Sequence, residues 1–188
     1  MTLLQKKSSE LTASNLSLFL AAATQRSLLR GENILKQGQI CKAVLFVEKG
    51  HLRTFFDKDG REINTSFTFE GNFTTNLKSL RSALPSEITI QAGEPTIVYE
   101  FNKDKLFELY KVSPEIESFG RKLIEQLLIV QEEHSNLFKI YSPTERYQYL
   151  LTKQPEILQR ISLSQLASYL GIARETLSRI RKVKTKIL

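Results

Sequence analysis

The sequence contains a single cysteine, Cys41, among its 188 residues. One cysteine excludes an internal disulfide, a four-cysteine zinc site and a cysteine-ligated iron–sulfur cluster within one chain. We therefore interpret Cys41 as a small hydrophobic residue near a strand, and we expect neither a metal nor a cofactor. A reducing cytoplasm is the natural setting for such a chain.

Long hydrophobic runs are also missing. The longest apolar run, residues 18–23, is far shorter than the roughly 20 residues that a membrane-spanning helix needs. Lys6 and Lys7 precede it as in a secretory signal, but polar residues between Glu10 and Asn15 interrupt the segment that would have to be apolar. We predict a cytoplasmic protein with no membrane partner.

The chain lacks the motifs that usually carry enzyme chemistry. It has no Gly-rich phosphate loop, no nucleophile elbow, no metal-ligand pair and no close pair of acids with a histidine. The one suggestive run, Glu132-Glu133-His134, fits the surface and seam of a helix. We predict that the protein is not an enzyme.

Positive charge is concentrated near the C-terminal end of the sequence. The net charge is +7, and residues 142–188 contain nine Lys or Arg and three Glu, which is 9 − 3 = +6. The remaining residues contribute about +1. Such asymmetry indicates a module that binds a polyanion, with a merely solvated basic face as the alternative.

Three patterns follow one another along the chain. Residues 10–30 read as helix, because Leu and Ala recur at helical spacing. Residues 33–101 hold short runs rich in Val, Ile, Phe and Thr, separated by turn residues every eight to twelve positions. This spacing predicts six to eight strands of a β sandwich or barrel, with a hairpin at Asp59-Gly60. A short helix broken by Pro114 comes next, and a long helix follows.

The long helix carries one apolar stripe. Its apolar positions recur in steps of three and four residues, close to the 3.5-residue mean of a coiled-coil seam. We interpret it as a dimer helix, with packing on its own domain as the alternative. His134 falls within the stripe, where a packed interface residue is commoner than a metal ligand. The predicted seam residues are Phe119, Leu123, Leu127, Val130 and Leu137.

The stretch "ISLSQLASYLGIARETLSRIRK", residues 161–182, has the full pattern of a helix-turn-helix. Ser162 or Ser164 caps the first helix, and Gly171 supplies a left-handed turn that residues with a Cβ resist. Ala167 is small because the two helices cross closely there. The alternative is a pair of helices joined by a glycine turn with no role in DNA binding.

The exposed face of the second helix, residues 173–182, favours DNA. Arg174 and Arg179 suit the O6/N7 edge of guanine, and Glu175 suits the N4 amine of cytosine. Further basic residues follow as phosphate-binding charges, which add affinity without sequence information. These residues are Arg181, Lys182, Lys184 and Lys186.

A β-rich domain, a long dimer-type helix and a C-terminal helix-turn-helix together resemble the Crp/Fnr family of bacterial transcription regulators. The resemblance covers nearly the whole chain and is most specific in "LASYLGIARETLSRIRK". It is weaker but collinear in "VLFVEKGHLRTFFDKDGREI" and "FEGNF". It implies an α+β fold: a cyclic-nucleotide-binding-like jelly-roll sensor domain in residues 1–113, a dimerisation helix in 114–141, and a helix-turn-helix domain of the winged-helix type in 142–188.

The resemblance also implies a function. Two protomers pair through the long helix and read a palindromic site in double-stranded DNA, and RNA polymerase becomes a candidate partner. By match to the motif, Arg174, Glu175 and Arg179 read bases with Ser178 beside them, and Thr176 contacts a backbone phosphate. The predicted DNA-binding residues are Ser164, Arg174, Glu175, Thr176, Ser178, Arg179, Arg181, Lys182 and Lys184.

The family's nucleotide-binding loop is degenerate here. In members that bind a cyclic nucleotide, a Gly-Glu-Leu holds the ribose and an Arg-Ser-Ala meets the phosphate. Thr75-Asn76-Leu77 and Ser86-Glu87-Ile88 stand in those places, so the charge-assisted pair is lost and Glu87 repels a phosphate. Lys78 and Arg81 are basic residues that could compensate. We expect no cyclic AMP binding, and either an unknown small-molecule effector or none. The residues of the degenerate pocket are Gly71, Phe73, Thr75, Asn76, Leu77, Arg81, Ser86 and Glu87.

One feature departs from the family pattern. Only about six residues follow Lys182, so we expect any wing to come from residues 153–163. The competing function is a ligand-binding or protein-interaction module whose basic helices form a docking surface without a specific operator. Salt-sensitive, sequence-selective binding of DNA distinguishes the two.

Overall fold

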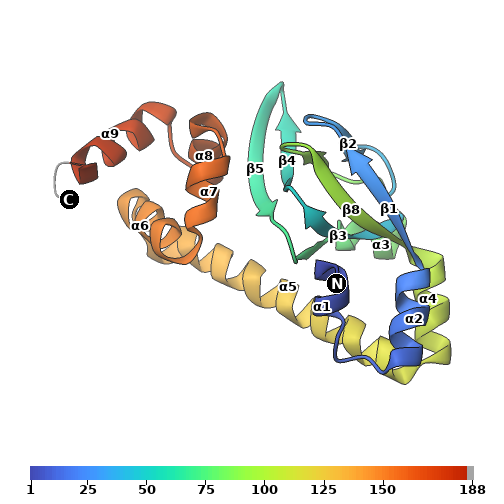
Figure 1. Cartoon of the computed structure of the whole chain (residues 1–188). Helices are drawn as coiled ribbons and strands as arrows, with labels where there is room; N and C mark the ends of the chain where they lie inside the picture. The colour runs from blue at the N-terminus through green and yellow to red at the C-terminus, as the bar shows by residue number, and fades with distance from the viewer. Residues whose placement is uncertain (186–188) are drawn as a thin grey trace. The chain divides into compact units, whose positions relative to one another are not determined.

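The computed structural model describes residues 1–185, and for residues 183–185 it describes the backbone alone. Within this range, eight strands form two four-stranded sheets, ordered β1-β8-β3-β6 and β2-β7-β4-β5 (Figure 1). The strands are β1 (Ala23–Leu28), β2 (Asn33–Leu35), β3 (Ala43–Lys49), β4 (Leu52–Lys58), β5 (Arg61–Thr68), β6 (Phe73–Thr74), β7 (Thr89–Ala92) and β8 (Thr96–Asn102). The predicted jelly-roll domain is confirmed.

Helices precede, interrupt and follow the sheets (Figure 1). They are α1 (Leu3–Lys7), α2 (Ala13–Ala21), α3 (Leu77–Ser82), α4 (Lys103–Val112), α5 (Pro114–Ile140), α6 (Pro143–Lys153), α7 (Pro155–Arg160), α8 (Leu163–Tyr169) and α9 (Arg174–Thr185). The long helix predicted from Pro114 is α5. The next helix, α6, is capped by Ser142, which accepts from the Glu145 N–H, and Pro143 is its first residue.

The prediction of helix over residues 10–30 is wrong in its second half. Helix α2 ends at Ala21, and β1 begins at Ala23. All of β1 pairs antiparallel with β8, from Ala23 opposite Phe101 to Leu28 opposite Thr96. The ladder with a strand far along the chain therefore overrides the local helical spacing.

Two hydrophobic clusters bury opposite faces of the β1-β8-β3-β6 sheet. Along β3, Leu45 and Val47 enter the cluster inside the roll, whereas Phe46 enters a cluster that packs against helices. Phe19 of α2 stacks on Phe101 of β8 at 4.5 Å and meets Phe119 of α5 edge-on at 5.3 Å. The first turns of α5 thus belong to the core of the β-roll domain.

Contacts divide the described chain into two compact units. One comprises residues 1–54 and 67–129, and the other comprises residues 55–66 and the chain from Val130 onward. The three segments expected from the sequence treat α5 as a separate piece, whereas the contacts divide α5 between the two units.

Candidate nucleic-acid interface and sensor cavities

Helix α8 begins with a complete capping box. The Ser162 hydroxyl accepts from the Gln165 N–H, and the Gln165 side chain accepts from the Ser162 N–H, so the cap is Ser162 rather than Ser164. Ala167 is 2% exposed, as its predicted place at the helix crossing requires. Ser164 is exposed on the first turn of α8, where its hydroxyl is accessible to a ligand.

The turn after α8 has the conformation that the sequence predicted. Gly171 has φ +66°, and the Ile172 N–H donates to the Ala167 carbonyl at 3.0 Å. A residue with a Cβ at this position would be strained, and its Cβ would lie 3.1 Å from Phe138 Cε1. The left-handed glycine therefore fixes the angle at which α9 leaves α8.

Arg146 of α6 braces this turn, a role that the sequence spacing did not reveal. Its Nη1 donates to the Leu170 carbonyl at 2.7 Å, and its Nε donates to the Tyr141 carbonyl at 3.0 Å. The guanidinium also lies over the ring of Phe138, 4.8 Å from its centroid. Because Leu170 lies 24 positions away in the sequence, no local pattern indicated this contact.

Helix α9 presents a polar face opposite a buried one. Leu177 is fully buried, whereas Arg174, Glu175, Arg179 and Lys182 are exposed. At 3.6 residues per turn, these exposed residues fall within an arc of about 140°. The half-buried Ser178 lies in the same arc. The face that carries the predicted base-reading residues is therefore open.

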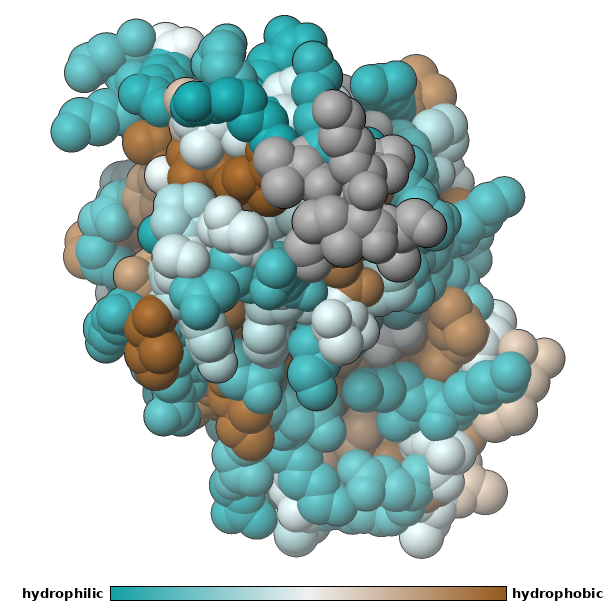
Figure 2. Space-filling model, turned by 90° about the vertical axis from the view of Figure 1, so that its left-hand side faces the viewer, coloured by the Kyte–Doolittle hydropathy of each residue, from teal (hydrophilic) through white to brown (hydrophobic). Residues whose placement is uncertain are grey.

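Two arginines on this face are electrostatically uncompensated. Among the described residues, no acid forms an ion pair with Arg174 or Arg179. Arg179 donates instead to the Thr176 hydroxyl at 3.3 Å, and Thr176 is half-buried. Figure 2 shows one face of the chain, on which hydrophilic side chains (teal) predominate among the coloured residues. Arg181 is exposed, and the side chain of Lys184 lies outside the described residues.

The segment expected to hold a wing is helical. Residues 155–160 form α7, which begins with Pro155 as its first residue and is followed by the cap of α8. No strand forms between residues 142 and 185, the described part of this module. Residues 153–163, the only segment from which we expected a wing could come, therefore supply no strand for one, and Pro155 starts a helix instead.

The loop predicted as a degenerate nucleotide site satisfies its own polar groups. The Asn76 side chain caps α3 by accepting from the Ser79 N–H, and its Nδ2 donates to the Ser86 hydroxyl at 2.7 Å. Ser86 in turn donates to the Ile88 carbonyl at 2.7 Å. Glu87 pairs with Lys78 at 2.5 Å, so a carboxylate competes with any anion for Lys78.

Other residues of the predicted pocket line a separate cavity of about 440 Å³, here called the α3–α5 cavity. Phe73, Thr75, Leu77 and Arg81 form one side of it. Helices α4 and α5 supply much of the remainder, including Phe107, Tyr110, Leu123 and Leu127. Gly71 lies outside this lining and makes the preceding turn, with φ +77° and its N–H donating to the Val47 carbonyl at 2.9 Å. The predicted pocket residues thus separate into a self-bonded loop and a largely apolar cavity.

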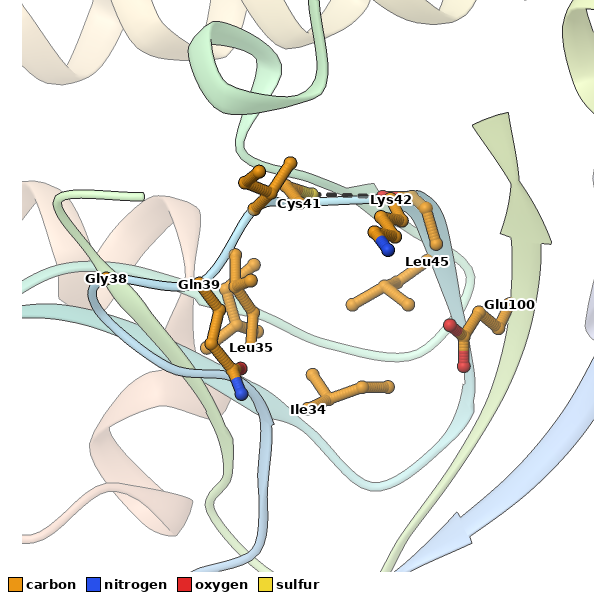
Figure 3. A pocket seen from close by; sticks show the side chains of 11 residues that line it. Ile34, Leu35, Gly38, Gln39, Cys41, Lys42, Leu45 and Glu100 are labelled. Atoms are coloured by element: carbon orange, nitrogen blue, oxygen red, sulfur yellow. Dashed lines mark hydrogen bonds between the residues drawn. The ribbon is translucent and has the colours of Figure 1, made fainter. Parts of the chain in front are cut away.

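A second cavity of about 510 Å³ opens beside β2 and β3 (Figure 3). Its lining includes the buried Cys41, whose thiol donates to the Ala43 carbonyl at 3.4 Å. Lys42 and Glu100 also line it, so charges of both signs are present. This mixture does not favour a ligand of one charge.

The predicted seam of α5 separates into buried and exposed residues. Phe119 is 4% exposed and Leu137 5% exposed, each within its own unit, so neither is available to a second chain. Leu123 and Leu127 are half-buried on the α3–α5 cavity. Of the five predicted residues, only Val130 is open, at 57%. Other apolar residues of the helix are exposed instead: Ile124, Leu128 and Ile129.

His134 packs among aromatic rings. Its ring lies 5.0 Å from Phe138 and 4.9 Å from Tyr169, and its Nε2 is buried without a hydrogen-bond partner among the described residues. Burial lowers the pKa of His134, because the charged form loses its solvation. The side chain is therefore neutral near pH 7.

Comparison with known proteins supports this arrangement. Residues 25–113 match the cyclic nucleotide-binding domain family. The Transcriptional activator protein FnrA of Stutzerimonas stutzeri is 25% identical over 166 residues, which cover 82% of this chain and 68% of the relative. The cAMP-activated global transcriptional regulator CRP of Salmonella typhimurium is 23% identical over 161 residues, covering 80% and 77%.

Solved structures share the fold. FixK2 from Bradyrhizobium japonicum superposes with a TM-score of 0.73 at 22% identity, covering 87% of this chain and 85% of the other. The c-di-GMP responsive global regulator CLP of Xanthomonas campestris gives 0.73 at 20% identity, covering 94% of each chain. Within the described residues, no helix combines the length and the apolar character needed to cross a bilayer.

Proposed function

The chain belongs to the Crp/Fnr family of transcriptional regulators, and we propose that it acts as a homodimer that binds a palindromic DNA site through α9. The observation that carries this proposal is the exposed face of α9, where Arg174 and Arg179 are not neutralised by any described acid. A charged, solvent-facing helix after a rigid glycine turn is the element that enters the major groove in helix-turn-helix proteins.

The residues of this face divide into two roles. Arg174 and Arg179 read guanine, and Glu175 accepts from the N4 amine of cytosine, with Ser178 beside them. The phosphate contacts come from the edges of α8 and α9 and set the position of the helix in the groove. They are Ser164, Thr176, Arg181, Lys182 and Lys184.

The second protomer pairs through α5. Its exposed apolar residues Leu128 and Ile129 lie on the side of the helix that faces away from Leu123 and Leu127. The partly exposed Ile124 adjoins Leu128 and also lines the α3–α5 cavity. A two-fold dimer then presents two α9 helices to half-sites one helical turn apart, roughly 34–36 Å.

The effector is not cyclic AMP in this proposal. Asn76 and Ser86 bond to each other, and Glu87 holds Lys78, so the loop offers no free donor set for a ribose phosphate. RNA polymerase is a candidate partner for a cytoplasmic regulator bound at a promoter. A further small-molecule effector, or none, is compatible with the DNA site.

A selection from a random duplex pool tests the function. The full chain is incubated with the pool in about 0.1 M salt, and the retained duplexes are sequenced over several rounds. We expect enrichment of two inverted half-sites with a fixed spacing. Enrichment that is lost in Arg174→Ala/Arg179→Ala but kept in the matched surface control Lys153→Ala supports α9 as the reader. Retention without any shared sequence would favour the docking-module alternative.

A further inference from the structure

The α3–α5 cavity carries one type of charge. Its polar side chains are Thr75, Arg81 and Tyr110, and no Asp or Glu is among its lining residues. Thr75 is already occupied, since its hydroxyl donates to the Ala43 carbonyl at 2.9 Å. The groups left for a ligand are therefore one guanidinium and one phenol against an otherwise apolar wall.

The size of the cavity suits a small organic molecule better than water. About 440 Å³ lies within the range of roughly 300–1,000 Å³ that is typical of ligand pockets. At about 30 Å³ per water, the space corresponds to roughly 15 molecules, and each needs two to four polar partners. Waters in this open cavity bond to one another but find only two available polar groups on its wall, so an occupant that covers the apolar wall and displaces them is favoured.

Arg81 supplies the positive charge. It lies in the last turn of α3, its side chain is exposed, and no described residue forms an ion pair with it. Its guanidinium lies 5.3 Å from the ring centroid of Phe107. Lys78, one turn earlier on the same helix, is held by Glu87 instead. The two basic residues of α3 thus differ: Arg81 lines the cavity and can bind an anion there with two hydrogen bonds, whereas Lys78 does not line it.

Tyr110 supplies a neutral donor nearby. Its ring lies 6.0 Å from that of Phe107, so Arg81 and Tyr110 flank one aromatic side chain. Burial raises the pKa of Tyr110 to about 12, helped by the Glu117 carboxylate, and the hydroxyl stays protonated. Among the described residues, no group shares a hydrogen bond with this hydroxyl.

Gly120 makes room for that hydroxyl. A Cβ built at Gly120 would overlap Tyr110 Oη, although glycine inside a helix is destabilising relative to alanine. A phenylalanine at position 110 would fill the same apolar space without a polar atom. The arrangement therefore keeps a hydroxyl beside the cavity that a ligand oxygen can use.

We propose that the α3–α5 cavity binds a small amphipathic monocarboxylate, with its carboxylate on Arg81 and Tyr110 and its apolar part between α3, α4 and α5. A cyclic nucleotide fits poorly, because its base and ribose would bury several polar groups without partners. Binding at this site does not depend on the proposed DNA site. A role of the monocarboxylate as an effector does rest on the proposed DNA binding, because an effector must change that binding. Helix α5, which lines the cavity and continues toward the helix-turn-helix, would carry the change.

Isothermal titration of the full-length protein tests the site. Octanoate and 2-naphthoate represent aliphatic and aromatic acids, octanamide is the neutral match to octanoate, and cyclic AMP is the nucleotide control. We expect saturable binding of at least one acid, and binding about tenfold weaker or undetectable for the neutral match. The acid that binds more tightly shows whether the apolar part of the ligand is aliphatic or aromatic.

Variants locate the ligand. Arg81→Gln is expected to weaken binding about tenfold, and Tyr110→Phe roughly threefold to tenfold, whereas Lys78→Gln on the same helix leaves it unchanged. Leu77→Trp, at a 39% exposed position on the lining, should block binding by filling the space. Circular dichroism confirms that each variant is folded.

Three outcomes would overturn the proposal. The first is no saturable binding of either acid, and the second is equal binding of octanoate and octanamide. The third is binding by a monomeric Leu128→Asp variant but not by the wild-type dimer, which would identify a second copy of α5 as the occupant. Acid binding that leaves DNA affinity unchanged would support the site and contradict only the effector role. Acid binding by a chain that fails to bind DNA would separate the site from the proposed function.

Discussion

Replacing Gly171 with alanine tests the geometry on which the helix-turn-helix, and with it the proposed DNA binding, depends. Gly171 has φ +66°, where an L-residue pays about 1–2 kcal/mol. The smaller freedom of alanine in the unfolded chain offsets about 0.4–1 kcal/mol of this. The new Cβ would also lie 3.1 Å from Phe138 Cε1 and 3.5 Å from Arg146 Nη1, so these side chains must shift. We expect a net loss of about 1 kcal/mol.

Amide hydrogen exchange measures this loss of stability at the turn. The Ile172 amide donates to the Ala167 carbonyl, so its exchange rate reports opening of the corner. A loss of about 1 kcal/mol corresponds to exchange roughly fivefold faster. Gly60→Ala is the matched control: it has φ +76° in the same unit, its Cβ would meet nothing within 4 Å, and we expect no change at Ile172. Unchanged or slower exchange in Gly171→Ala would refute the left-handed turn.

Three further predictions concern the face of α9, the dimer and pH. Arg179→Ala should relax discrimination at one base pair of each half-site by about 1–3 kcal/mol, measured by competition with substituted duplexes; unchanged discrimination would remove Arg179 from the base-reading residues. Leu128→Asp/Ile129→Asp should sediment as monomer and the exposed control Gln126→Asp as dimer. A double variant that remains dimeric would exclude this surface as the dimer interface. Because burial lowers the pKa of His134 below the 6.5 of an exposed histidine, its unfolded state binds more protons in acid. Stability should therefore be complete above about pH 6.5 and decline as pH falls toward the folded pKa. Denaturant unfolding at several pH values should show that the free energy of unfolding declines less in acid for His134→Leu than for the wild type. If the two proteins show the same pH dependence, His134 is not the group responsible.

The helix-turn-helix was predictable from the sequence because its determinants are local. The cap at Ser162 and the left-handed Gly171 each act within a few residues of their partners. The β-roll was also recognisable, since turn residues at regular spacing mark its strands. The start of β1 was not, because only pairing with β8 makes residues 23–28 extended.

The apolar stripe of α5 shows where periodicity is insufficient. Helical spacing identifies a buried face but not what buries it. Phe119 packs on Phe19, which is 100 positions away in the sequence, and so belongs to the core rather than the dimer. The seam proposed instead comes from residues exposed in the fold, such as Leu128.

The degenerate pocket, which includes α3, shows the same limit of prediction from sequence. Lys78 and Arg81 are equivalent in the sequence, one turn apart on one short helix. Their roles differ because Glu87 reaches Lys78 and Phe107 lies beneath Arg81, and neither contact is visible in the local pattern. By contrast, the absence of an arginine at Ser86 was evident from the sequence and is consistent with the self-bonded loop.

The salt dependence of binding to a selected palindrome tests the central claim most directly. Arg181, Lys182 and Lys184 of each protomer give six phosphate contacts per dimer, for which log Kobs should fall with log salt at a slope of about −5.4. Fluorescence anisotropy between about 0.05 and 0.2 M salt gives the slope, and sedimentation gives the number of protein chains bound per duplex. We predict one dimer per duplex, a slope near this value, and at least about 1,000-fold weaker binding to a scrambled duplex. Equal affinity for the scrambled duplex, or a slope near zero, would contradict sequence-specific DNA binding through α9.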